Sequence, residues 1–287
     1  MNARLRRVAT TVAVVIAVFL LAGATYQGLA TAFERRDFPP PGQRIDVGGH
    51  QLHIYCTGEG RPAVVLEAPA TGMSAAWGWV QPEIARRTRV CSYDRAGLGW
   101  SEAGDGGYDP RHVPTELHTL LAAARVTAPY ILVGESLGAT FVRMYVARYA
   151  GEVGGVVLVD DVTPAVRAED AARRETFARF VKYAPWLARA GVLRATRLLS
   201  SGAKGLPEPA GGAVGSFLNR PDHLTRSGRE LARWDETLRL ASETPLPQGL
   251  PVAEVRTGSV EPGALITTPA VAANVTNAIV AMVEARR

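Results

Sequence analysis

The chain of 287 residues is long enough to bury one large hydrophobic core. Apolar residues make up 47% of it and charged residues 21%, and its net charge of +5 comes almost entirely from scattered arginines, so the composition does not indicate a nucleic-acid-binding protein. Because it has no Cys/His spacing typical of a zinc site and no glycine-rich phosphate loop, we expect neither a metal nor a cofactor.

The N-terminal region contains an uncharged segment over residues 8–33. It exceeds the about 20 apolar residues that a helix needs to cross a bilayer. Three arginines lie in residues 1–7, whereas residues 34–37 carry no net charge, so we expect a cytoplasmic N-terminus and an extracytoplasmic main domain. The triplet at 22–24, Ala-Gly-Ala, resembles a signal-peptidase site, so secretion after cleavage remains an alternative.

A proline-rich linker over residues 34–41 is expected next, because Phe-Pro-Pro-Pro-Gly disfavours both helix and sheet. Short apolar strands then alternate with helical patterns. The expected strands are 44–47, 51–56, 63–67, 89–94, 130–133, 153–161 and 252–256. This alternation predicts an α/β fold with a doubly wound, mostly parallel sheet. Residues 163–245 are helical and form an expected insertion, and a last helix begins at Pro269.

The segment 130–149 joins a buried strand pattern to a helical pattern through Gly134-Glu-Ser136-Leu-Gly138. A serine at the sharp turn between a strand and a helix is typical of a nucleophile elbow. The two glycines fit this interpretation, because Cβ atoms there would clash where strand and helix pack closely. The pattern therefore predicts Ser136 as the nucleophile.

These motifs together resemble the α/β-hydrolase family, and the N-terminal segment makes the chain similar to a bacterial subgroup of membrane-anchored members. The resemblance rests on 55–58 (Tyr-Cys-Thr-Gly), 66–68 (Leu-Glu-Ala), 91–97, the elbow and 158–160. It implies a core built from 42–162 and a shortened 246–287, with 163–245 as a lid. It also implies acyl transfer from a small-molecule or lipid-like ester to Ser136. The oligomeric state is not readable from the sequence.

The resemblance assigns further roles to residues around Ser136. The N–H groups of Leu137 and Ala70 match the oxyanion-hole donors, each typically worth about 2.7–4 kcal/mol in the transition state. Glu135 stands where the family often has histidine and is expected to line the pocket.

Cys56 and Cys91 lie on strands that are neighbours in the family fold. A disulfide between them is expected if their Cα atoms lie within about 7 Å, and an extracytoplasmic domain would permit it. Two buried free thiols are the alternative.

The histidine of the family's triad has no counterpart in this sequence. The family order is Ser, acid, His, but no histidine follows His223, and only residues 258–268 separate the seventh strand from the last helix. A parallel crossover needs a dozen or more residues. The eighth strand and the histidine loop are therefore expected to be missing.

Other residues could replace the missing groups. His223 in the lid is the candidate base, and Asp161 or Glu261 is the candidate acid, although Asp161 also suits a helix cap. Serine without a base is a poor nucleophile. Three interpretations therefore remain: an anchored serine hydrolase, a pseudoenzyme or binding module, and a chain that lost its histidine segment by deletion or sequence error.

Overall fold

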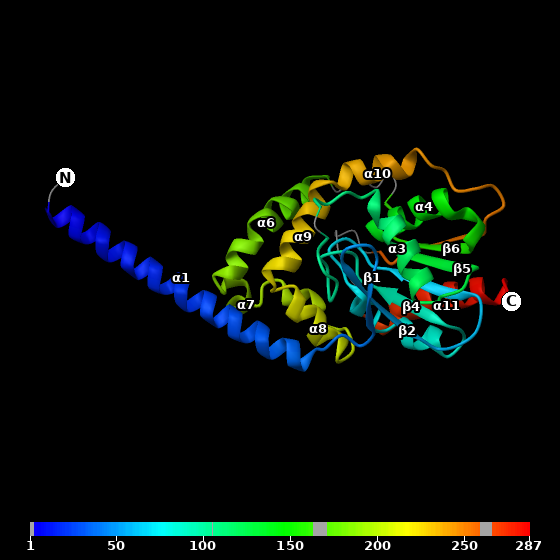
Figure 1. Ribbon diagram of the computed structural model, residues 1–287, viewed down its shortest axis with the longest axis horizontal. Helices are drawn as coiled ribbons and strands as arrows, with labels where there is room; N and C mark the ends of the chain where they lie inside the picture. Colours follow the sequence, from blue (N-terminus) through cyan, green and yellow to red (C-terminus); the bar gives the residue numbers. More distant parts are fainter. Residues whose placement is uncertain (1–2, 105, 163–170, 259–265) are drawn as a thin grey trace.

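A seven-stranded sheet forms the centre of the computed structural model, which describes residues 3–104, 106–162, 171–258 and 266–287 (Figure 1). The strand order is β1-β2-β4-β3-β5-β6-β7. The strands are β1 (Gln43–Asp46), β2 (Gln51–Thr57), β3 (Ala63–Glu67), β4 (Val90–Tyr93), β5 (Tyr130–Glu135), β6 (Val153–Val159) and β7 (Val252–Val255). The first two strands run antiparallel to their neighbours and the other five are mutually parallel, which confirms the predicted α/β fold.

Helices cover both faces of the sheet, so the central strands are buried on both sides. Strands β3, β5 and β6 are therefore nearly continuous runs of Val, Ile and Leu, as parallel strands require. One face packs against α3 (His112–Ala123) and α4 (Leu137–Tyr149). The other packs against the 3₁₀ turn η1 (Ser74–Trp77), α2 (Gln81–Ala85) and α11 (Pro269–Glu284).

The last helix, α11, begins where the sequence predicts. Thr268 caps it by accepting a hydrogen bond from the Val271 N–H, and Pro269 occupies the first turn, where a missing N–H is tolerated. Its buried face, which includes Val275 and Ile279, packs on the sheet. In the part of the chain that the structure describes, no strand follows β7, in agreement with the predicted loss of the last strand.

The lid consists of helices inserted between β6 and β7. They are α6 (Ala171–Arg189), α7 (Val192–Thr196), η3 (Ser200–Ala203), α8 (Ala210–Phe217), α9 (Pro221–Ala232) and α10 (Trp234–Ser242). The lid is amphipathic, and its apolar side chains Val181, Leu231 and Trp234 form a cluster with residues of the sheet domain. This cluster holds the lid over the N-terminal end of α4.

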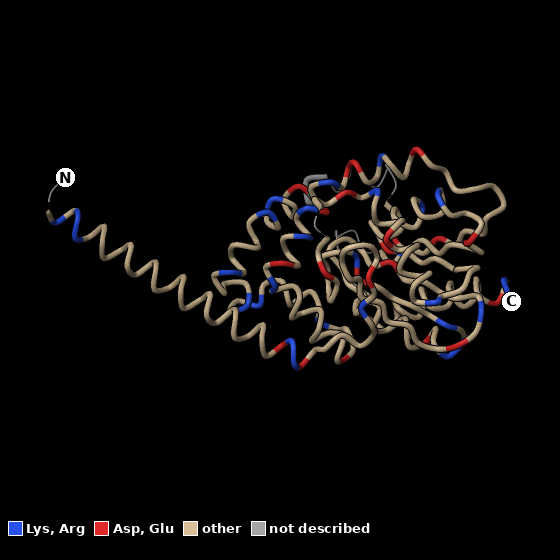
Figure 2. The backbone as a smooth tube through the Cα atoms, viewed as in Figure 1, with Lys and Arg blue, Asp and Glu red and all other residues tan. Residues whose placement is uncertain are grey.

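The N-terminal helix α1 (Ala3–Asp37) extends away from the rest of the molecule, with the lid between it and the sheet (Figure 1). It is long and apolar enough to cross a membrane, with a mean hydropathy of 2.4 over 18 residues. Charged residues occur only near its two ends (Figure 2). The helix ends at Asp37, so it includes the first four residues of the linker predicted at 34–41.

The second half of α1 packs on the lid. Gln27 is buried; its amide donates to the Asn219 carbonyl and its oxygen accepts from Arg194 Nε at 3.0 Å. Arg194 also forms an ion pair with Glu34. Gly23 lies so close to the Ala190 carbonyl that a Cβ atom would overlap it. Part of the segment expected at 8–33 is therefore covered by protein.

Candidate active site

Ser136 occupies the turn between β5 and α4 with φ 54° and ψ −119°. A positive φ is strained for a residue other than glycine and is typical of functional turns. The Ser136 N–H donates to Val159 O at 2.8 Å, and its C=O accepts from Ala139 N at 3.0 Å. These bonds fix the turn and leave the half-buried side chain at its apex.

The two glycines of the elbow are explained by close backbone contacts. A Cβ atom on Gly134 would lie 2.5 Å from the Gly138 carbonyl oxygen. A Cβ atom on Gly138 would lie 2.6 Å from the Ala68 carbonyl oxygen. The elbow therefore needs glycine at both positions so that strand, helix and the loop after β3 can approach one another.

The two expected oxyanion donors meet beneath the lid. Ala70 and Leu137 are completely buried and belong to the same apolar cluster as Val181, Leu231 and Trp234. Leu137 is the first residue of α4, so its N–H has no acceptor within the helix. The described structure thus places both residues in a region that excludes water, where hydrogen bonds to a developing charge are strongest.

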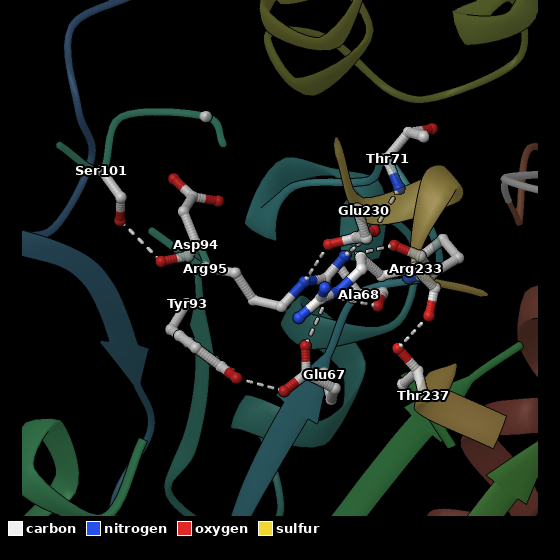
Figure 3. Close-up of polar contacts among 12 residues, drawn as sticks. Glu67, Ala68, Thr71, Tyr93, Asp94, Arg95, Ser101, Glu230, Arg233 and Thr237 are labelled. Carbon is white, nitrogen blue, oxygen red and sulfur yellow. Dashed lines mark hydrogen bonds and ion pairs between the residues drawn. The ribbon is translucent and has the colours of Figure 1, made fainter. Parts of the chain in front are cut away.

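Buried Arg95 holds the backbone of the loop that carries Ala70 (Figure 3). Its guanidinium donates from Nη1 to Ala68 O and from Nη2 to Pro69 O, each at 2.8 Å. Thr71 adopts φ 59°, and its N–H donates to Glu230 Oε1 of α9 at 2.9 Å. The loop conformation therefore depends on side chains from both the sheet domain and the lid.

Arg95 also lies between two buried carboxylates. Its Nη1 is 2.5 Å from Glu67 Oε1, and its Nε is 2.9 Å from Glu230 Oε2. None of the three residues is more than 2% exposed. Burial raises the pKa of Glu67 to about 6, although the charge of Arg95 and the Tyr93 hydroxyl oppose the shift. Sequence reasoning missed this cluster; its one visible signal was the charged residues at the ends of two buried strands.

His223, the candidate base, is occupied by two other partners. Its Nδ1 accepts from the Gly99 N–H at 3.1 Å, so its Nε2 carries the proton and donates to Thr71 O at 3.0 Å. Burial lowers the pKa of this histidine to about 4. Neither ring nitrogen is available to Ser136, and His223 instead holds the loop that carries Ala70. The geometry does not fit a base.

The other four histidines do not hydrogen-bond with Ser136 either. His53 Nδ1 is 2.9 Å from buried Asp94, and His118 Nε2 is 3.0 Å from Glu152. His50 lies 3.5 Å from Glu116, and His112 is exposed at the start of α3. All five histidines therefore lie in the described structure without a hydrogen bond to the predicted nucleophile.

The candidate acids have separate roles. Asp161 is buried and paired with Arg143 of α4, whose Nε lies 3.2 Å away. The neighbouring Asp160 accepts a hydrogen bond from the Thr257 N–H at 2.8 Å and so links the ends of β6 and β7. Glu261 lies outside the described residues, as does the helix that Asp161 was considered to cap.

Glu135 precedes the nucleophile and is 4% exposed. Burial, together with the charge of Asp160, raises its pKa well above the usual range. The site therefore favours the neutral carboxyl form of Glu135. A neutral carboxyl group beside Ser136 can donate a hydrogen bond, but it cannot accept the serine proton.

The expected partners Cys56 and Cys91 are joined by a disulfide. They are paired residues on β2 and β4, with Cα atoms 4.0 Å apart. The bond ties the antiparallel edge of the sheet to its parallel centre.

Known proteins support the same architecture. The family described as "alpha/beta hydrolase fold" matches residues 62–199. An uncharacterized protein of Schizosaccharomyces pombe is 33% identical over 115 residues, which cover 40% of this chain and 21% of that protein. The 2-hydroxy-6-oxo-2,4-heptadienoate hydrolase of Pseudomonas putida is 27% identical over 124 residues, 42% of this chain and 45% of that enzyme. The chain thus covers less than half of the length of these relatives.

Among solved structures, the epoxide hydrolase CorEH is similar with a TM-score of 0.59 and 20% identity, over 75% of this chain and 81% of that one. At that identity the likeness concerns the fold alone. The sheet order, the elbow at Ser136 and the matched family segment agree with one another. The chain has the α/β-hydrolase fold.

Proposed function

We propose that this protein is a membrane-anchored serine hydrolase that transfers the acyl group of an ester-type substrate to Ser136. The match to the α/β-hydrolase family model supports a hydrolase-type function. The observation that carries the proposal is the strained serine at the elbow, placed beside the buried residues Ala70 and Leu137. Backbone strain of this kind clusters at functional sites, which favours a role for Ser136 in the chemistry.

In the proposed reaction, Ser136 Oγ attacks the ester carbonyl carbon. The N–H groups of Leu137 and Ala70 stabilise the negative charge that develops on the carbonyl oxygen. The bond to the alcohol oxygen then breaks, and the alcohol leaves with the serine proton. Water hydrolyses the acyl-enzyme, which releases the acid and restores Ser136.

The rate should be low, because no histidine is placed to take the serine proton. An oxyanion hole and substrate binding without a complete triad give roughly 10³–10⁴-fold acceleration over water. The same observation favours a second candidate function, a binding module that retains acyl compounds without turning them over. The two differ in one respect: only the hydrolase forms a covalent bond at Ser136.

The proposed membrane placement rests on α1 and on the lid surface beside it. Residues 3–22 form about 30 Å of helix before Gly23 meets the lid, which matches the thickness of a bilayer's hydrocarbon core. The lid near this point exposes large apolar side chains: Tyr183, Trp186, Leu187, Val192 and Leu198. Tyr and Trp are enriched where membranes meet water. The disulfide suits an extracytoplasmic domain with a cytoplasmic N-terminus.

Turnover of a short-chain p-nitrophenyl ester by the full-length chain in detergent tests the proposal. We expect slow hydrolysis that Ser136→Ala abolishes and that Ser242→Ala, at an exposed serine of α10, leaves unchanged. Equal rates in wild type and Ser136→Ala would refute acyl transfer through Ser136. Binding of the ester without any turnover would favour the second candidate.

A further inference from the structure

A cleft of about 670 Å³ lies between the segment after α1, the loop after β4, and lid helices α8 and α9. Neither Ser136 nor either expected oxyanion donor lines it, so it is separate from the candidate active site. Its described lining contains six arginines: Arg35, Arg44, Arg189, Arg220, Arg226 and Arg229.

The positive charges in this cleft are poorly balanced. Two carboxylates, Glu102 and Asp222, belong to the described lining. Glu102 lies 3.8 Å from Arg44, which leaves five guanidinium groups and the single carboxylate of Asp222. None of those five forms an ion pair within 4.0 Å with a residue that the structure describes. The described lining therefore carries a net positive charge that a bound anion would neutralise.

Arg220 and Arg226 are held in position by aromatic rings. The Arg220 guanidinium carbon is 3.7 Å from the centre of the Phe217 ring, and that of Arg226 is 4.3 Å from the centre of the Tyr108 ring. Stacking fixes the guanidinium planes. Arg220 also donates from Nη2 to Ser216 Oγ at 3.2 Å. The Nε atoms of both arginines are buried without a hydrogen-bond acceptor among the described residues. A buried donor without an acceptor is unfavourable, so a ligand oxygen that accepts from these atoms would be stabilising.

The pKa values of two of these arginines reflect their burial. Burial lowers the pKa of Arg220 to about 10; the carboxylate of Glu34 opposes this shift, and Arg35 and Arg194 add to it. Burial also lowers the pKa of Arg226 below its ordinary value, although the charge of Glu230 opposes the shift. An anion in the cleft would offset the cost of burying these charges.

We propose that this cleft binds the phosphate group of a phosphorylated ligand, either a soluble phosphate compound or an anionic phospholipid head group. Paired guanidinium N–H groups match the oxygens of phosphate. The rings of Trp100 and Phe217 meet edge to face 5.3 Å apart and form an apolar wall for the rest of the ligand. Arg189 adjoins Ala190, which packs on Gly23 of α1, so one end of the cleft lies near the proposed membrane segment.

Thermal unfolding of the full-length protein in detergent, titrated with inorganic phosphate at constant ionic strength, tests the site. We expect a saturable rise in Tm that equal concentrations of chloride do not produce. Arg226→Gln and Arg220→Gln should each weaken the apparent Kd by about tenfold or more, through the loss of a charge-assisted hydrogen bond. Arg179→Gln is the matched control, because Arg179 is an exposed lid arginine already paired with Glu175. It should leave the Kd unchanged.

The Tm of the variants without phosphate distinguishes a loss of binding from a folding defect. Without phosphate, Arg226→Gln should not lower Tm, because it removes an unneutralised charge. Arg220→Lys, which keeps the charge, should retain part of the binding. A phosphate effect that survives in both glutamine variants, or one that chloride reproduces, would overturn the proposal.

The source of the phosphate is distinguished in nanodiscs of phosphatidylcholine with or without phosphatidylglycerol. If phosphatidylglycerol weakens binding of inorganic phosphate, and Arg226→Gln removes that competition, the cleft takes a lipid head group. If phosphate binds equally in both membranes, it takes a soluble phosphate compound. Failure of this site would leave the chemistry at Ser136 untouched, since neither Ser136 nor the expected oxyanion donors line the cleft.

Discussion

Replacing Glu230 by glutamine removes the lid's charge from the cluster that holds the loop of Ala70. Glu230 is completely buried and accepts three hydrogen bonds, at 2.9 and 3.0 Å from Arg95 and at 2.9 Å from the Thr71 N–H. Glutamine keeps the shape but places an NH₂ group against a donor of Arg95. Breaking a buried ion pair on one side typically costs about 3–5 kcal/mol. Because Glu67 still pairs with Arg95, we expect about 3 kcal/mol.

The assay is thermal and urea unfolding of the full-length protein, followed by tryptophan fluorescence. A loss of about 3 kcal/mol corresponds to a Tm decrease of roughly 6–12 °C in a domain of this size. Glu83→Gln is the control: Glu83 pairs with Arg86 on the surface, with side chains 47% and 70% exposed, and should contribute at most about 1 kcal/mol. If Glu230→Gln is as mild as Glu83→Gln, the cluster does not hold the lid to the loop.

Two further changes test other parts of the site. The pKa of His223 is about 4 in the folded protein and near 6.5 in the unfolded chain. As the pH drops from 6.5 to 4, the unfolded chain therefore binds a proton that the folded protein does not. The free energy of unfolding should fall over this range by an amount on the order of 3 kcal/mol. In urea titrations across this pH range, His223→Gln should remove this decrease in the free energy of unfolding, and His112→Gln should not. If the free energy of unfolding of His223→Gln depended on pH as in the wild type, the lowered pKa of His223 would be contradicted. Gly138→Ala should destabilise the protein by about 1–3 kcal/mol because of the clash with Ala68. Gly151→Ala, where a Cβ atom meets nothing within 4 Å, is its control, and equal stability of the two variants would refute the packing explanation.

Local patterns sufficed to predict the parts of the fold that depend on neighbouring residues. Patterns of about 20 residues or fewer predict the Val- and Ile-rich strands, the elbow around Ser136 and the helix that begins at Pro269. The pairing of Cys56 with Cys91 followed from the strand order that the family resemblance supplied. In these cases sequence spacing and spatial proximity carry the same information.

Long-range side-chain contacts could not be predicted in this way. Arg95 and Glu230 are 135 residues apart, and nothing in either local pattern indicates the other. The same holds for His223, whose partners Gly99 and Thr71 come from two different loops. The sequence of a helical lid shows its amphipathic period, but it does not show which residues its polar side chains will contact. The contact of Gln27 with the lid was hidden for the same reason, inside a segment that resembles a lipid-facing helix.

The central claim is that Ser136 is a nucleophile supported by the elbow and the oxyanion donors, even without a histidine. The most direct test is exposure of the full-length protein to a fluorophosphonate probe, followed by mass spectrometry of the peptide that contains residue 136. We expect a covalent adduct on Ser136 that forms slowly and is absent from Ser136→Ala. The claim would be contradicted if the Ser136 peptide remained unmodified while a known serine hydrolase in the same sample was fully labelled.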